Sequence, residues 1–84
     1  MELVISLEPA EVTLELRENG SSLDAEMFSY YHDLDLKLIT HIDILLKRNK
    51  IDINALNSYK IQGNLGENAT SVKIAEAVVE GLKS

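Results

Sequence analysis

The chain has 84 residues, a length typical of one small domain with a radius of gyration of about 12 Å and a thin core that oligomerisation would stabilise. Hydrophobic residues make up 45% of the chain and charged residues 26%, which excludes a disordered protein, and the absence of cysteine excludes disulfide scaffolds and thiol catalysis. Fourteen Asp and Glu against eight Lys and Arg give a net charge of −6, which disfavours direct binding to nucleic acid.

Three antiparallel strands are predicted in the first part of the chain. The first is the apolar, β-branched run over residues 3–7. The second covers residues 12–16, where apolar and polar side chains alternate. Asn19-Gly20 then favours a type I′ turn, which Ser21-Ser22 are expected to lengthen. Residues 25–32 carry three of the four aromatic side chains and suit a third strand.

Two amphipathic helices and a short strand follow. Apolar residues recur at helical spacing over 35–49, and a connecting turn over 51–56 leads to a brief strand over 59–62. The second helix is predicted over 69–83, after a loop over 64–68 whose last residue is a candidate N-cap. The order is β-β-β-α-β-α in one α/β domain covering residues 1–84. The first helix, the connecting turn and the second strand are expected to bury apolar side chains in the core. They are Leu38, Ile39, Ile42, Leu45 and Leu46 of the first helix, Ile53 and Leu56 of the turn, and Val12, Leu14 and Leu16 of the second strand.

The apolar side chains of the second helix cover an arc of roughly 240°. Because one contact surface cannot use an arc this wide, the helix either lies between the sheet and the first helix or faces a partner chain. A row of mostly small side chains along it would let another helix approach closely. On the first helix, one isoleucine lies outside the main apolar stripe. The residues predicted for an interface are Ile44, Thr70, Ile74, Ala77, Val78 and Gly81.

No catalytic or metal-binding motif stands out. His32 and His41 have no partner at a recognised ligand spacing and are interpreted as surface residues. Asp33, Asp35 and Asp43 lack the EF-hand spacing and are interpreted as helix caps and helix surface. The serine element G-x-S-x-G is absent. We therefore predict no catalytic residue, no metal and no cofactor.

One loop leaves an alternative open. Residues Gly63–Asn68 connect a strand to a helix, and free N–H groups at a helix N-terminus can bind an anion. A small nucleotide-binding or enzymatic domain that uses this loop is the alternative to an interaction module, and a self-associating regulatory protein is a third possibility.

The second half of the chain carries a series of short motifs from about Leu34 to Lys83. They are LITHIDILL at residues 38–46, DINAL at 52–56, IQG at 61–63, TSVKI at 70–74 and EGL at 80–82. In order and spacing they resemble the N-terminal domain of the bacterial TsaB (YeaZ-type) family, the partner subunit in tRNA threonylcarbamoyladenosine biosynthesis. That family has a helix with the pattern L-x-P-x-I-D-x-L-L, a DLD turn, a strand, a G-x-G-P-G-S-F-T-G-L-R loop and a helix ending in K-G-L. The like positions are Gly63, Thr70, Ile74, Ala77, Gly81 and Leu82, and Lys73 replaces the arginine.

The resemblance implies the first half of an actin-like, ribonuclease-H-like ATPase fold. It also implies that the two helices form an interface with a TsaD-like subunit or with a second copy. We therefore expect a non-catalytic, helix-mediated interaction module near tRNA modification, a homodimer or heterodimer without direct nucleic-acid contact. Where actin-like ATPases place a phosphate-binding turn, residues 8–11 read E-P-A-E, so no ATP binding tighter than millimolar is expected. The chain shows neither a signal-peptide pattern nor an apolar run of about 18 residues, which predicts a cytoplasmic protein without membrane contact.

Overall fold

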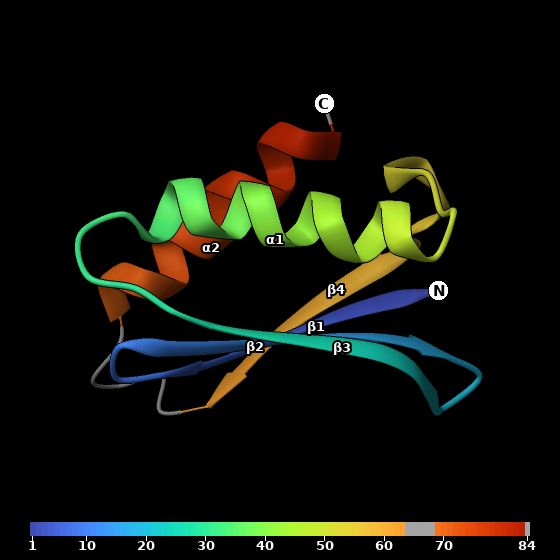
Figure 1. Cartoon of the computed structure of the whole chain (residues 1–84), viewed down its shortest axis with the longest axis horizontal. Helices are drawn as coiled ribbons and strands as arrows, with labels where there is room; N and C mark the ends of the chain where they lie inside the picture. The colour runs from blue at the N-terminus through green and yellow to red at the C-terminus, as the bar shows by residue number, and fades with distance from the viewer. Residues whose placement is uncertain (64–68, 84) are drawn as a thin grey trace.

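The computed structural model describes residues 1–63 and 69–83. Four strands form one mixed sheet in the order β3-β2-β1-β4, in which β1, β2 and β3 are antiparallel neighbours and β4 runs parallel to β1. Both helices cover the same face of this sheet (Figure 1). The predicted α/β class and the β-β-β-α-β-α order are confirmed. The elements are β1 (Glu2–Glu8), β2 (Glu11–Glu18), β3 (Ser21–Ser29), α1 (Leu34–Arg48), the 3₁₀ turn η1 (Ile53–Ala55), β4 (Ser58–Gly63) and α2 (Ala69–Lys83).

The turn between β2 and β3 contains only two residues. Asn19 and Gly20 have φ angles of 54° and 81°, the positive values that a type I′ turn requires. The ladder therefore resumes at once, with Ser21 opposite Glu18. The prediction that Ser21 and Ser22 lengthen the turn is wrong, because the two-residue turn already closes the hairpin. For the same reason β3 begins at Ser21 rather than at residue 25. It ends at Ser29 rather than at residue 32, because Ser29 lies opposite Glu11, where its partner β2 begins.

The core lies between the sheet and the two helices. All the predicted strand core residues are buried, and so are Leu38, Ile42, Leu45 and Leu46 of α1, which confirms these predictions. Leu56 is buried as predicted, and Ile53 is half-buried against the core. Ile39 was wrongly placed in the core, because it is 43% exposed. The other apolar residues of α1 already fill its contacts with the sheet and with α2, and Ile39 is left at their margin.

The other face of the sheet carries mostly polar side chains. The strand register places Ser6, Thr13, Met27 and Gln62 in one row across this face, opposite in direction to the buried leucines. Gln62 donates a hydrogen bond to the Ser6 hydroxyl at 2.9 Å, and Met27 is 62% exposed. Within residues 1–63 and 69–83, no helix is packed on this side (Figure 1). Neither helix of the described residues is long and apolar enough to cross a membrane.

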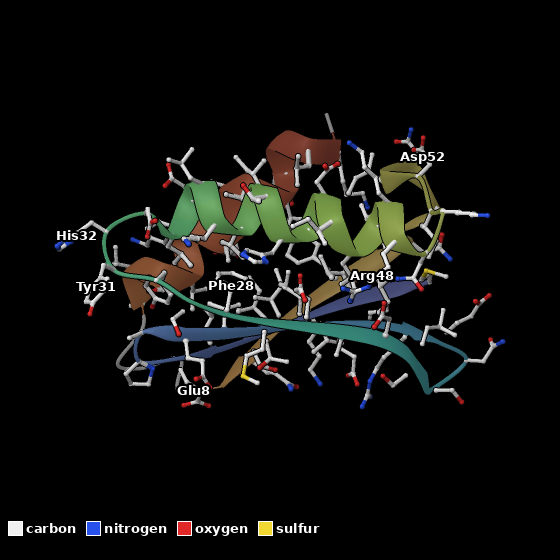
Figure 2. All side chains as sticks on the ribbon, in the orientation of Figure 1. Glu8, Phe28, Tyr31, His32, Arg48 and Asp52 are labelled. Carbon is white, nitrogen blue, oxygen red and sulfur yellow. The ribbon has the colours of Figure 1, made fainter. Side chains whose placement is uncertain are left out.

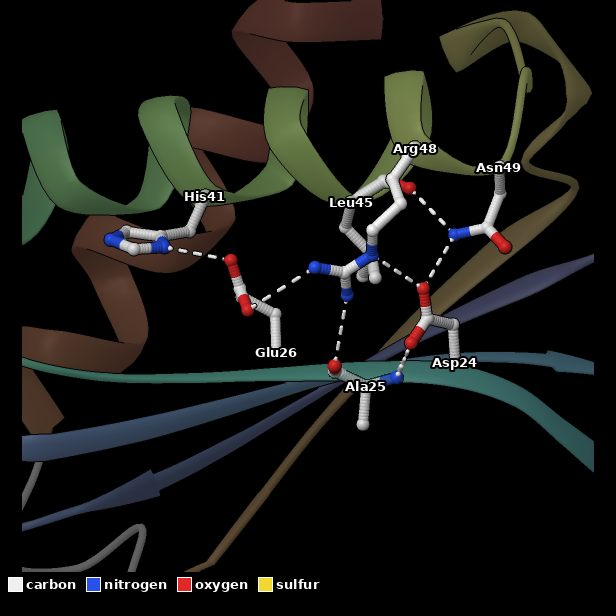
Figure 3. Close-up of polar contacts among 7 residues, drawn as sticks. All are labelled: Asp24, Ala25, Glu26, His41, Leu45, Arg48 and Asn49. Carbon is white, nitrogen blue, oxygen red and sulfur yellow. Dashed lines mark hydrogen bonds and ion pairs between the residues drawn. The ribbon is translucent and has the colours of Figure 1, made fainter.

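A polar cluster fixes the end of α1 on β3 (Figure 3). Arg48 Nε donates to Asp24 Oδ2 at 2.8 Å, and its Nη2 donates to the backbone oxygen of Ala25 at 3.1 Å. Asn49 Nδ2 donates to the same Asp24 oxygen at 2.9 Å and to the carbonyl oxygen of Leu45 at 2.8 Å. These bonds join a helix end to a strand more than twenty residues earlier, and so help to decide which side of α1 turns outward.

His41 belongs to the same cluster. Its Nδ1 lies 3.3 Å from Oε2 of Glu26, and its ring stacks on Phe28 with centroids 4.4 Å apart. Figure 2 shows Phe28 between β3 and α1, whereas His32 and Tyr31 point into solvent from the connection before α1. The interpretation of His32 as a surface residue is confirmed. That of His41 is wrong, because β3 brings a carboxylate and an aromatic ring beneath the helix and leaves His41 only half-buried.

The cluster makes the free energy of unfolding depend on pH in the acid range. Hydrogen bonds from Arg48 and then Asn49 lower the pKa of Asp24 from its ordinary 3.8 to about 2. A carboxyl group whose pKa is lower in the folded state contributes stability that is fully present above pH 3.8 and is lost as the pH falls through 2. We expect Asp24→Asn to lower the free energy of unfolding at neutral pH and to flatten its decline over that interval. Urea unfolding measured across the interval tests this expectation.

Asp43 provides the matched control for that experiment. It pairs with Lys47 at 3.0 Å on the exposed side of α1, where such an i,i+4 pair is worth about 0.3–0.5 kcal/mol. Asp43→Asn should therefore change stability little. An acid dependence of unfolding that is the same in wild type and in Asp24→Asn would contradict the assignment.

Candidate functional site

A groove opens on the outer side of the helix layer. It lies between α1, the segment that follows α1, and the end of α2, and its volume is about 790 Å³. The size is within the usual range of binding sites, and most of the large lining side chains are apolar. Thr40, Asp43, Lys47, Lys50 and Asp52 supply polar groups of both charges. The apolar lining comprises Ile39, Ile42, Ile44, Leu46, Ile51, Ile53 and Leu82.

The end of α1 forms one wall of the groove by a standard helix-terminating motif. The N–H of Ile51 donates to the carbonyl oxygen of Leu46 at 2.9 Å, and the N–H of Lys50 donates to that of Lys47 at 3.1 Å. These are the two bonds of a Schellman motif, with Lys50 in the left-handed position at φ 56°. The motif folds Ile51 back towards α1. The Asp52 carboxylate then accepts from the N–H of Asn54 at 2.9 Å and starts η1.

Large apolar side chains also remain exposed on α1. Leu36 is 65% exposed, Ile39 43% and Ile44 40%, and the last two line the groove. A single exposed apolar residue needs no explanation, but three on one helix, two of which line an apolar groove, mark a candidate contact surface. We call this surface the helical face: the groove together with Leu36 and the exposed small residues Ala77 and Gly81 of α2.

The structure divides the six predicted interface residues into two groups. Ile44, Thr70, Ala77 and Gly81 are exposed, and a Cβ atom built on Gly81 would meet no atom within 4 Å. The larger Ile74 and Val78 are half-buried and pack against the core cluster. Of these six, only Ile44 lines the groove. That any of them contacts a partner remains a prediction.

Sequence reasoning missed much of the groove. Ile39 was assigned to the core, and Ile51 and Ile53 to a connecting turn, because the pattern gives no sign that the chain turns back beside α1. The loop proposed for the alternative function, Gly63–Asn68, lies outside the described residues except for Gly63. Among residues 1–63 and 69–83, no group of three or more His, Asp and Glu is placed to hold a metal ion.

Comparison with known proteins adds no relative. The chain matches no protein-family model, no curated protein and no solved structure. The likeness to the TsaB family remains a hypothesis from the short motifs in residues 34–83.

Proposed function

We propose that this protein is a non-catalytic interaction module that binds a partner protein through its helical face. The observation that carries the proposal is the apolar groove beside the exposed Leu36, Ile39 and Ile44. Removing each of these side chains from water would contribute on the order of 1 kcal/mol to binding. A groove bordered by α-helices suits a partner helix that inserts apolar side chains at i, i+3 or i+4 spacing.

The partner class that we propose is a TsaD-like subunit in tRNA threonylcarbamoyladenosine modification. The motif series in residues 34–83 supports this choice, and the strand order with β4 parallel to β1 agrees with the first half of an actin-like, ribonuclease-H-like fold. The net charge of −6 favours contact with a protein over direct contact with tRNA. In this proposal the module acts in the cytoplasm and carries out no chemistry itself.

Binding to the TsaD-like protein of the same organism, measured by calorimetry, tests the proposal. We expect Ile44→Asp and Ala77→Glu each to weaken binding roughly 30-fold or more, the size of an interface hot spot. Both positions are exposed, so circular dichroism and thermal unfolding should be nearly unchanged. Met27→Asp is the control, because Met27 is also an exposed apolar residue, at 62% against 40% for Ile44, but lies on the opposite face of the sheet. It should leave affinity unchanged.

Three results would contradict the proposal. They are no binding by the wild type, equal losses of affinity in Met27→Asp and Ile44→Asp, and micromolar binding of ATP.

We expect ATP binding no tighter than millimolar, because Glu8 and Glu11 face each other across the Pro9-Ala10 turn. Two carboxylates repel a negatively charged polyphosphate, and Pro9 has no backbone N–H to donate to it. Glu8 is exposed at the end of β1 (Figure 2).

A further inference from the structure

The two edges of the sheet are protected unequally. At the β3 edge, Asp24 and Glu26 turn their carboxylates towards the helix side of the sheet, opposite Leu16 and Leu14. Arg48 covers this edge and occupies a backbone acceptor of β3, and a bulge interrupts the ladder beside Leu16. Inward-facing charges and bulges are the devices by which natural sheets prevent further strands from adding.

The β4 edge has neither an inward-facing charge nor a bulge. β4 pairs with β1 along its whole length, and within the described residues no strand pairs with its other side. It contains no proline, and its single charge is Lys60 on the polar face. On the helix side, Tyr59 and Ile61 are only half-buried, although the Tyr59 hydroxyl donates to Glu80 of α2 at 3.0 Å. Unpaired backbone groups beside half-buried apolar side chains are a template for an added strand.

We propose that β4 pairs antiparallel with β4 of a second copy, so that the two sheets become one. In an antiparallel pair, directly opposite residues lie on the same face of the sheet. Two registers therefore remain near the middle of β4, one centred on residue 60 and one on residue 61. One places Lys60 opposite its own copy, a repulsive pair. The other places Ile61 opposite its own copy, Lys60 opposite Gln62, and Tyr59 opposite Gly63. The second register buries both isoleucines and covers a glycine with an aromatic ring, a pairing known to stabilise strands.

A second copy fits this edge because the strand complements itself about Ile61. A two-fold axis through that residue forms the same contacts twice, as in an isologous dimer. The axis is perpendicular to the sheet, so both helix layers lie on the same side of the merged sheet. The dimer thus uses a surface separate from that of the proposed function and does not depend on it.

Single-cysteine variants test the register, because the natural chain has no cysteine. In the proposed register the two Cα atoms at position 61 are about 4.5–5.5 Å apart, within the range of a disulfide. Ile61→Cys should therefore form a covalent dimer under mild oxidation. Lys60→Cys, offset from its own copy and beyond about 7 Å, should form much less. Ala77→Cys reports on the helical face and should remain uncrosslinked. Efficient crosslinking through position 60 or 77, but not 61, would overturn the proposal.

A charge pair at position 62 supplies a second measurement, made by sedimentation equilibrium. Gln62→Lys places a lysine opposite Lys60 of the other copy, and the two-fold axis creates this repulsive pair twice. The dimer dissociation constant should therefore rise roughly 2- to 30-fold, whereas Gln62→Glu creates two attractive pairs and should lower it. Both changes replace the same exposed residue and its bond to Ser6, so their effects on the single chain are matched. A wild-type monomer at all concentrations, or a shift of both variants in the same direction, would refute the pairing. Neither variant should alter the partner binding that Ile44→Asp removes.

Discussion

Replacing Ile42 by alanine should lower the free energy of unfolding by about 2–5 kcal/mol. Ile42 is 1% exposed within the core, so truncation removes buried contacts and leaves a cavity. Ile44, two positions further on the same helix, is 40% exposed. Ile44→Ala should cost less than about 1 kcal/mol, because part of the removed surface already faces water and alanine is the better helix former.

This pair of variants tests the orientation of α1, on which the helical face depends. Urea unfolding of both proteins, with an unchanged denaturant slope, provides the two free energies. Equal losses would mean that Ile44 belongs to the core of the single chain, and the case for an interface through it would fail. The predicted asymmetry would instead confirm that α1 packs through Ile42 and exposes Ile44.

Gly63→Ala should destabilise the protein by about 2–4 kcal/mol, for two separate reasons. Gly63 has a φ of 109°, a region that residues with a Cβ rarely adopt. A Cβ at this position would also overlap the backbone carbonyl oxygen of Leu7 on the neighbouring strand. A backbone atom of β1 cannot move aside without disturbing the parallel ladder, so thermal and urea unfolding should both show the loss.

Gly20→Ala is the matched control for Gly63→Ala. Gly20 also has a positive φ, 81°, but a Cβ there would meet no atom within 4 Å. Only the conformational cost remains, about 1–2 kcal/mol. Equal losses at the two positions would show that the contact with Leu7 has no energetic weight. A larger loss at position 63 would explain the glycine by the approach of β1, without reference to a phosphate.

The sequence by itself determined the features that depend on near neighbours. Alternation over residues 12–16 predicts β2, and Asn19-Gly20 predicts the tight turn, because this dipeptide adopts positive φ at two successive residues with little strain. Helical periodicity likewise predicts α1 and α2 to within about a residue. These choices are made by steric and hydrogen-bonding preferences that act over a few residues, so a pattern in the chain is sufficient to reveal them.

Only the tertiary structure decided which surfaces remain open. The contact of His41 with Glu26 and the exposure of Ile39 both depend on how α1 lies on the sheet. The groove depends on it too, whereas the open edge of β4 follows from the strand order of the sheet. Burial is shared among elements that are distant in sequence, and a side chain at the margin of an apolar stripe is covered or exposed according to where its neighbours end. Which side chains are covered is therefore not visible in any local pattern of the sequence.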